Sequence, residues 1–177
     1  MYKPYTILSV YDILNDDKIE ILKSTIQYYK NFYFKKNTYE INKTKNNWKQ
    51  TFGNINLNYF TPDCESVINS IFDKIIEKYY PNESGVREYS LQFYKEGHFI
   101  DKHKDGGNLK VFTFIIYLND DWQKEQGGEL IMEDGYEIIP HWETIVLMDF
   151  TNNNVAHEVK EIKSGIRYAI YCSFQKK

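Results

Sequence analysis

The residue types and spacings that could support chemistry lie in the second half of the chain. His103 and Asp105 are two positions apart in DKHKDGG, and His157 follows in NNNVAHEV. Two imidazoles and one carboxylate can hold one face of an iron(II) ion, which leaves the opposite positions open for substrate and oxygen. Arg167 follows in SGIRYAIYCSF, and its planar guanidinium can bind a carboxylate through two parallel hydrogen bonds. These residues predict a metal site beside a site for a dicarboxylate co-substrate.

The local pattern shows whether the first two candidates can act together. Side chains two positions apart in an extended segment project to the same side, so His103 and Asp105 can reach one metal ion. Asp101 falls on that side too, and the periodicity leaves open a metal set that includes it. We interpret the other two histidines, His98 and His141, as structural.

Each remaining candidate has a structural interpretation when it is taken alone. His157 could be a surface or hydrogen-bonded histidine, and Arg167 could be a salt-bridged residue at a strand edge. An inward-facing arginine, by contrast, would require a carboxylate nearby. Tyr94 could be a core aromatic residue, and Trp122 could anchor a loop.

A β-rich segment must position these residues. Beyond residue 86 the chain is a succession of short alternating runs broken by Gly and Asn, which predicts an antiparallel β domain. We expect strands near 86–94, 98–103, 110–118, 128–132, 136–139, 144–149 and 166–174. Short strands in this number are typical of a sandwich or jelly roll. In KVFTFIIYL, alternation places Thr113 and Tyr117 on one face, where their hydroxyl groups could line a cavity.

The first half of the chain is predicted to support this β domain. YTILSVYDIL is interpreted as a first strand, and the acidic segment after Asn15 opens a helix. A second helix has Thr61 as its N-cap and Pro62 in its first turn, and it ends at Pro81. Apolar residues recur on one face of both, so we expect amphipathic helices packed on the sheet. The polar segment KKNTYEINKTKNNWKQTFGN between them is expected to form a mobile or hairpin-like loop.

Composition and charge bound the class of protein. A length of 177 residues, 42% of them hydrophobic, suits one domain over 1–177, with N-terminal support over 1–85 and a β core over 86–177. The net charge of −3 gives no global basic field, so nucleic acid is not favoured as a partner. The sequence has neither a signal peptide nor an apolar run near the roughly 20 residues of a membrane span. Cys64 and Cys172 are expected to be free thiols, which favours a cytoplasmic location.

Several motifs occur in an order that resembles a known family. They are FYKEG before the first candidate ligand, YLNDDW, the Gly127–Gly128 pair, the turn at Pro140, HEV and RYAI. One of them would be weak evidence, but their shared order makes the match specific. Over roughly residues 90–172 the chain resembles the prolyl 4-hydroxylase branch of the 2-oxoglutarate- and iron(II)-dependent dioxygenases, and is most similar to the small oxygen-sensing prolyl hydroxylases. The fold implied is a double-stranded β-helix, which is a mainly β jelly roll with the metal at its open end.

The resemblance also implies roles for the matching residues. The iron ligands implied are His103, Asp105 and His157. The residues assigned to the 2-oxoglutarate pocket are Arg167 and Tyr117 on the distal carboxylate, Tyr94 on the wall and, from the strand pattern, Thr113. Trp122 is a further candidate for substrate contact. Tyr171 and Ser173 depart from the family, because relatives often carry a small hydroxyl residue and a tryptophan at these positions.

The reaction implied uses iron(II), 2-oxoglutarate and O2, with ascorbate as an additional reductant. It would hydroxylate a prolyl residue of a protein or peptide and release succinate and CO2. The same cofactors could instead serve a lysyl side chain, a free amino acid or another small molecule. A nucleobase is less favoured, because demethylases of this superfamily usually carry a second arginine six positions after the first, and Ser173 stands there. A jelly-roll binding module without turnover is a third possibility, and the oligomeric state is open.

Overall fold

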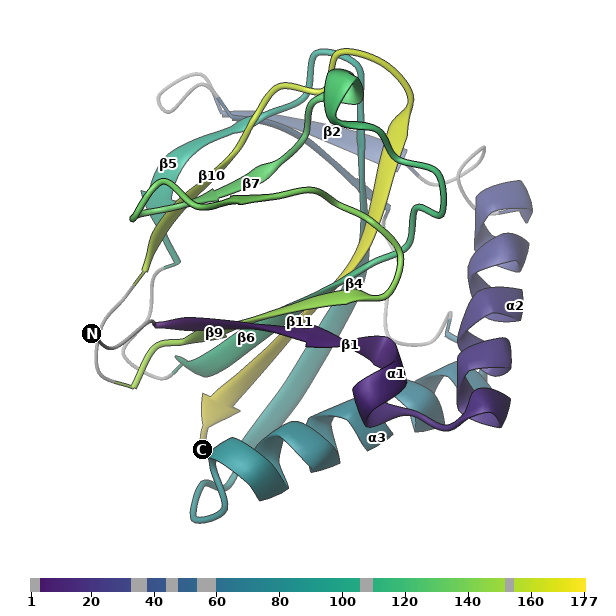
Figure 1. The fold of residues 1–177 in the computed structure, drawn as a ribbon, viewed down its shortest axis with the longest axis vertical. Helices are drawn as coiled ribbons and strands as arrows, with labels where there is room; N and C mark the ends of the chain where they lie inside the picture. The colour runs from purple at the N-terminus through teal and green to yellow at the C-terminus, as the bar shows by residue number, and fades with distance from the viewer. Residues whose placement is uncertain (1–3, 33–37, 44–47, 54–59, 106–109, 152–154) are drawn as a thin grey trace.

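The computed structural model describes residues 4–32, 38–43, 48–53, 60–105, 110–151 and 155–177. Two antiparallel sheets form two facing layers (Figure 1). The larger sheet has seven strands in the order β1-β9-β6-β11-β4-β3-β2, and the smaller has four in the order β5-β10-β7-β8. Facing antiparallel sheets of this kind form a jelly roll. The predicted mainly β, antiparallel architecture is therefore confirmed.

The strand bounds show which strands the sequence pattern predicted and which one it did not predict. The larger sheet consists of β1 (Tyr5–Ser9), β9 (Thr144–Asp149), β6 (Lys110–Tyr117), β11 (Ile166–Lys176), β4 (Gly85–Lys95), β3 (Trp48–Gly53) and β2 (Thr38–Lys43). The smaller consists of β5 (Ile100–Lys104), β10 (Ala156–Val159), β7 (Leu130–Met132) and β8 (Glu137–Ile138). Every strand expected in the second half has a counterpart, but β10 was not expected. A strand of four residues places only two side chains on each face, too few for a visible alternation.

Strand β6 shows why the larger sheet is buried on both faces. Phe114 and Ile116 pack in a cluster with residues of the helices, whereas Ile115 and Tyr117 pack in a second cluster between the two sheets. The alternation that separates these two sets follows from the period of two along a strand. The second cluster is the layer in which the candidate site lies.

Two helices lie on the outer side of the larger sheet (Figure 1). Helix α3 (Pro62–Tyr79) begins after Thr61, whose side chain accepts a hydrogen bond from the backbone N–H of Cys64 at 3.2 Å. Phe72 of α3 packs edge-on against Phe114 of β6, with ring centroids 4.7 Å apart. Helix α2 (Asp16–Phe32) contributes Ile19 and other apolar side chains to the same cluster. Among the described residues, no helix is both long and apolar enough to cross a membrane.

The first strand is shorter than predicted. YTILSVYDIL was interpreted as one strand, but β1 ends at Ser9 and a short helix, α1 (Val10–Ile13), follows. The Ser9 side chain accepts a hydrogen bond from the backbone N–H of Tyr11 at 3.2 Å and so caps this helix. The turn buries Val10, whose N–H donates to the carbonyl of Glu143 at 2.8 Å. The strand interpretation is wrong beyond Ser9 because the capping contact competes with the extended pairing.

The polar segment between the helices contains a hairpin. Strands β2 and β3 pair antiparallel from Thr38 with Gly53 to Lys43 with Trp48. Strand β3 also pairs with β4 and so extends the larger sheet. The hairpin-like form expected for this segment is confirmed for 38–43 and 48–53, while 35–37, 44–47 and 54 lie outside the described residues.

Candidate metal centre and co-substrate pocket

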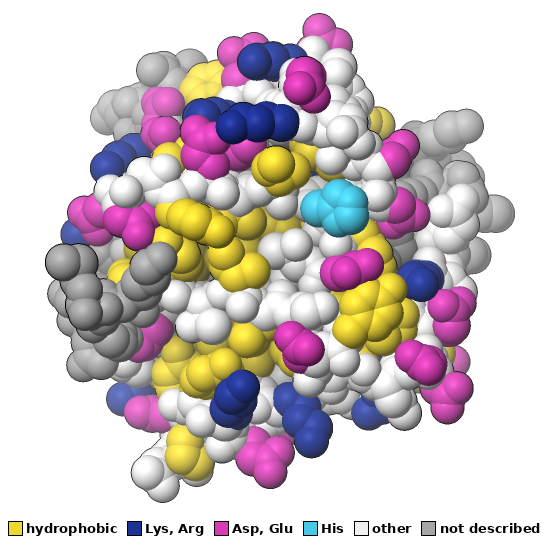
Figure 2. All heavy atoms as spheres, in the orientation of Figure 1, with side chains coloured by type: hydrophobic (Ala, Val, Ile, Leu, Met, Phe, Trp, Pro, Cys, Tyr) yellow, Lys and Arg dark blue, Asp and Glu magenta, His cyan; other side chains and the backbone are white. Residues whose placement is uncertain are grey.

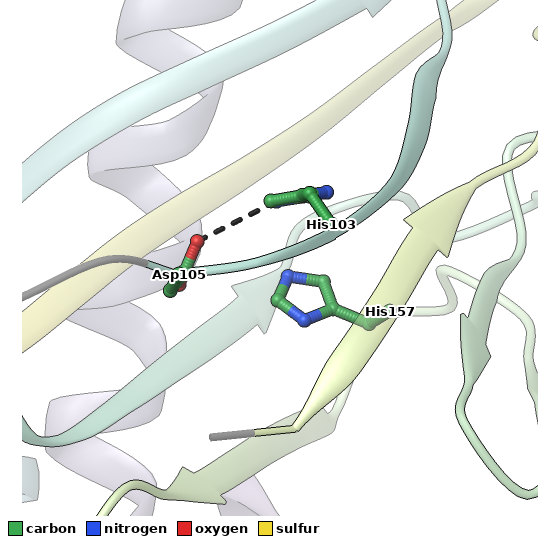
Figure 3. A group of neighbouring side chains, drawn as sticks. All are labelled: His103, Asp105 and His157. Carbon is green, nitrogen blue, oxygen red and sulfur yellow. Dashed lines mark ion pairs between the residues drawn. The ribbon is translucent and has the colours of Figure 1, made fainter. Parts of the chain in front are cut away.

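Neighbouring strands of the smaller sheet bring the two histidines together. In the antiparallel pair of β5 and β10, His103 and His157 are direct partners across the ladder. Their ring centroids are 4.4 Å apart, and Asp105 follows immediately after the end of β5. Figure 3 shows the three side chains pointing toward one another, from segments about fifty residues apart in the chain. Pairing of two strands places these residues side by side although they are far apart in the sequence.

The three groups are close enough to share one cation. One ligand atom from each of His103, Asp105 and His157 lies within 4.8 Å of the other two. Cis ligands at about 2.1 Å from a metal lie about 3 Å apart, so a modest inward movement of the side chains would complete the set. Asp101 is not in the cluster found among the described residues, so the rival metal set receives no support.

Backbone carbonyls orient both imidazoles. Nδ1 of His103 lies 2.8 Å from the carbonyl oxygen of Asp101, and Nδ1 of His157 lies 3.0 Å from that of Val155. A carbonyl can only accept, so each Nδ1 carries a proton, and in a neutral ring Nε2 is then the nitrogen that can bind a cation. Donation from the second ring nitrogen is the usual arrangement of histidines that bind metals.

The charges of the cluster suit a cation. Burial opposes ionisation of Asp105, but the hydrogen bond to His103 and nearby basic groups outweigh it and lower the pKa of the carboxyl to about 2. Burial lowers the pKa of His157, although the Asp105 carboxylate acts in the opposite direction. The site therefore presents an ionised carboxylate and a neutral imidazole at neutral pH, which are the forms that bind a metal.

A cavity of about 290 Å³ extends from this cluster toward the interior between the sheets. Its lining residues come from both layers and are Ser90, Gln92, Tyr94, Ile100, His103, Asp105, Ile115, Leu130, His157, Val159, Arg167 and Tyr171. The candidate ligands and the candidate arginine thus share one cavity. The volume and mixed lining are typical of a site for a small molecule.

Arg167 is a buried charge without an acidic partner. It is only 2% exposed, and its guanidinium lies over the rings of Tyr94 and Tyr117 at 4.8 and 4.9 Å. Its Nη2 donates a hydrogen bond to the hydroxyl of Tyr117 at 3.3 Å, while its Nε has no hydrogen-bond partner in the described part of the chain. Among the described residues, no carboxylate forms an ion pair with it. A buried charge is costly when it is unpaired, so the geometry fits a pocket for an anionic group such as a carboxylate.

The wall behind Arg167 depends on close packing at a glycine pair. Gly128 has a φ of +74°, and an added Cβ would overlap Ile162 and lie 3.2 Å from Cδ of Arg167. The indole N–H of Trp122 donates to the carbonyl of Gly127 at 2.9 Å. Trp122 is buried here and is not among the residues that line the cavity. This position fits the loop-anchoring interpretation, and substrate contact by Trp122 stays a prediction without structural support.

Other candidates occupy less direct positions. Thr113 is fully buried, its hydroxyl has no hydrogen-bond partner among the described residues, and it does not line the cavity. Tyr117 is also absent from the lining but reaches the site through Arg167. His98 and His141 lie outside the metal cluster, and His141 is exposed with Nδ1 2.9 Å from the carbonyl of Trp142.

Four polar residues near the site were not predicted from the sequence. Ser90 and Gln92 line the cavity from β4, and Tyr171 lines it from β11. Alternation from Tyr94 along β4 could have identified the first two, since they share its face. Lys110, at the start of β6, lies 3.9 Å from Oδ2 of Asp105. No sequence signal would have found Lys110, because its contacts depend on the pairing of β6 with β11.

The comparison with protein families agrees with the site. The sequence model of the 2OG-Fe(II) oxygenase superfamily matches residues 89–175, which include all three candidate ligands and Arg167. The resemblance that the motif order indicated is thereby confirmed for the matched segment. A comparison with curated protein sequences found no match.

Solved structures with the same fold include several prolyl hydroxylases. A Pseudomonas putida prolyl-4-hydroxylase matches with a TM-score of 0.75 and 17% identity, over 98% of this chain and 93% of that one. A Trichoplax adhaerens prolyl hydroxylase, in complex with a peptide of a hypoxia inducible factor, matches with a TM-score of 0.70 and 19% identity, over 98% and 84%. The viral collagen prolyl hydroxylase of Paramecium Bursaria Chlorella virus-1, in complex with 2OG, matches with a TM-score of 0.65 and 19% identity, over 99% and 97%. At these identities the likeness establishes only that this chain shares their fold.

Proposed function

We propose that this protein is a 2-oxoglutarate- and iron(II)-dependent dioxygenase that hydroxylates a prolyl residue in a protein or peptide, with release of succinate and CO2. The observation that carries the proposal is a single cavity with a His-Asp-His cluster at one part of its wall and a buried, unpaired guanidinium at another. Such a cavity suits a molecule that chelates a metal at one end and presents a carboxylate at the other. When bound, iron and 2-oxoglutarate would supply the oxidation of a C–H bond.

The residues of the chain would bind and orient these groups. His103, Asp105 and His157 would hold the metal through Nε2 atoms and a carboxylate oxygen. Arg167 would bind the distal carboxylate of 2-oxoglutarate, because a guanidinium forms two parallel hydrogen bonds with a carboxylate. The hydroxyl of Tyr117 accepts from Arg167 at 3.3 Å and so helps to fix the direction of the guanidinium.

Apolar side chains would keep the reacting groups away from bulk water. Ile100, Leu130 and Val159 line the same cavity and are each at most 8% exposed. Tyr94 closes another part of the wall and is 2% exposed. A preorganised site with few water molecules strengthens the electrostatic contacts made inside it.

A peptidyl substrate is the best supported of the candidates. Structures that share the fold include prolyl hydroxylases of bacterial, animal and viral origin, and one of them is bound to a peptide. The charge distribution does not indicate a nucleic acid, since acidic and basic side chains are interspersed on the face shown in Figure 2. Tyr171 lines the cavity and will shape substrate contact there.

The test supplies the purified protein with iron(II), 2-oxoglutarate, O2 and ascorbate as reductant. A library of proline-containing peptides is then screened for succinate and for a mass increase of one oxygen atom. Matched peptides that carry 4-hydroxyproline or alanine at the same position control for the site of reaction. Succinate formed only with the proline peptides supports the proposal, and its absence across a broad library contradicts the prolyl assignment.

Other substrates are outcomes of the same assay. Oxidation of lysyl peptides, free amino acids, small molecules or methylated oligonucleotides would keep the cofactors and replace the substrate. A binding module without turnover is distinguished before any reaction, by whether the protein binds 2-oxoglutarate. Calorimetry with Mn(II) as an inert substitute for iron measures whether 2-oxoglutarate binds, and no binding by the metal-loaded protein would favour that module.

A further inference from the structure

The two oxygens of the Asp105 carboxylate have different partners. Oδ1 lies 3.5 Å from Nε2 of His103 and so faces the imidazole cluster. Oδ2 accepts a hydrogen bond from the hydroxyl of Tyr171 on β11, at 3.2 Å. The amino group of Lys110 lies 3.9 Å from the same Oδ2. One oxygen is thus available to a cation, and the other is already engaged.

Lys110 fixes the direction in which Tyr171 donates. The Lys110 amino group donates a hydrogen bond to the Tyr171 hydroxyl oxygen at 2.9 Å. An ammonium group has no acceptor, so the phenol oxygen must accept in this contact. The phenol proton is then directed to Asp105, and the three groups form a chain of donors that ends at Oδ2.

The engaged oxygen matters for the number of open positions on a metal. A carboxylate that binds through both oxygens would occupy a position that the co-substrate or oxygen needs. We propose that Tyr171, oriented by Lys110, is a positioning residue that holds Oδ2 away from the ion, so that Asp105 binds through Oδ1 alone. The inference rests on the proposed metal site and is independent of the substrate.

The residue type at position 171 supports this role. Position 171 carries a phenol, whose hydroxyl lies at the far end of a long side chain. Across the ladder, Tyr171 is the partner of Ser90 on β4 and of Ile115 on β6, so it lies in the interior of the larger sheet. From that position a long aromatic side chain spans the distance to a ligand that follows β5. The length of this side chain therefore allows its hydroxyl to reach Oδ2 of Asp105 at 3.2 Å.

The test compares Tyr171→Phe with Tyr168→Phe, which is the same change on the same strand with the side chain on the opposite face. Calorimetry measures Mn(II) affinity, and visible absorption of the Co(II)-substituted protein reports the number and geometry of the ligands. Loss of an outer-shell partner typically costs at least about tenfold in metal affinity. We expect that loss and an altered Co(II) spectrum for Tyr171→Phe, with neither change for Tyr168→Phe.

A double-mutant cycle tests the part played by Lys110. If Lys110 acts through the hydroxyl, Lys110→Met will change Mn(II) affinity by clearly different factors in the wild type and in the Tyr171→Phe variant. Equal factors would show that Lys110 acts independently, which contradicts the chain of donors. Thermal unfolding of each metal-free variant shows whether a change in affinity comes from a loss of fold.

The outcomes separate this inference from the proposed function. If the wild type binds neither Mn(II) nor 2-oxoglutarate, the metal site itself is wrong and the inference fails with it. If the wild type binds both and Tyr171→Phe matches it in affinity and Co(II) spectrum, the positioning role alone is overturned.

Discussion

The two ends of the cavity are built from different kinds of structure. At the co-substrate end, Arg167 lies in β11, which pairs with β4 on one side and with β6 on the other. At the metal end, His103 and His157 lie on strands of five and four residues in the smaller sheet. Asp105 follows its strand and is not part of it. The guanidinium is held by the interior of the larger sheet, whereas the metal ligands are held by hydrogen bonds to nearby groups.

Because of this difference, substitutions at the two ends should affect ligand binding and fold stability to different extents. A buried guanidinium without an anionic partner opposes folding. The packing of the larger sheet must offset this free-energy cost until an anion binds. At the metal end, the side chains of His103 and Asp105 are each 16% exposed, and only His157 is buried. Substitutions at the metal end should therefore affect mainly metal binding, while substitutions around Arg167 should change both binding and stability.

The largest effect is expected at the metal end. His157→Ala removes one of three ligands and should weaken Mn(II) binding by more than about 100-fold, beyond what loss of an outer-shell partner costs. The free energy of unfolding of the metal-free protein should fall by only about 1 kcal/mol, for the lost hydrogen bond to Val155. The control is His141→Ala, which removes an exposed histidine with a similar contact to a backbone carbonyl. A comparable loss of Mn(II) affinity in the control would contradict the assignment of the ligands.

The opposite pattern is expected for Arg167→Met. Affinity for 2-oxoglutarate should fall by about 100-fold, because charge-assisted hydrogen bonds contribute about 3 kcal/mol, while Mn(II) affinity changes little. In the absence of 2-oxoglutarate the variant should be at least as stable to urea as the wild type, since an unpaired buried charge is gone. Arg87→Met serves as the control, because Arg87 forms an ion pair with Asp73 far from the cavity. Equal losses of metal and co-substrate affinity would refute the role given to Arg167.

The glycine pair behind the guanidinium gives an intermediate effect. Gly128→Ala should destabilise the fold by about 3 kcal/mol, since it adds a steric clash with Ile162 to the strain of a positive φ. Gly135→Ala has a similar φ of +81° with nothing within 4 Å, so it should lose only about 1 kcal/mol. Urea unfolding measures both variants, and the difference between them reports the close packing of Gly128 against Ile162 and Arg167. Equal destabilisation would mean that this wall does not constrain the site.

The sequence was informative where local pattern determines position. Alternation along β11 puts Arg167 and Tyr171 on one face, and both line the cavity, because a long strand displays its period within a few residues. The strand that carries His157 could not be identified in this way, since four residues are too few to display an alternation. The structure, and not the sequence, places His157 opposite His103.

The sequence also could not predict whether a carboxylate of the protein pairs with Arg167. The chain has 25 acidic residues, and any of them could have paired with Arg167. Only the packing of β4, β6 and β11 shows that no described carboxylate reaches it. In the same way, the contact between Lys110 and Tyr171 requires the register of β6 against β11, which alternation cannot supply.

The smallest effect is expected at the co-substrate end, for the tyrosine that contacts the guanidinium. Tyr117→Phe removes the hydroxyl that accepts from Arg167 but keeps the ring, whose centroid lies 4.9 Å from the guanidinium carbon. The contact is long for a hydrogen bond, so its loss should cost only about 1 kcal/mol, and 2-oxoglutarate affinity should fall by about fivefold with no change in Mn(II) affinity. Tyr136→Phe is the control, because Tyr136 is exposed and does not line the cavity. Since Tyr117 does not line the cavity either, a loss specific to Tyr117→Phe must be transmitted by the guanidinium. An unchanged affinity would show that the larger sheet orients Arg167 without this hydroxyl.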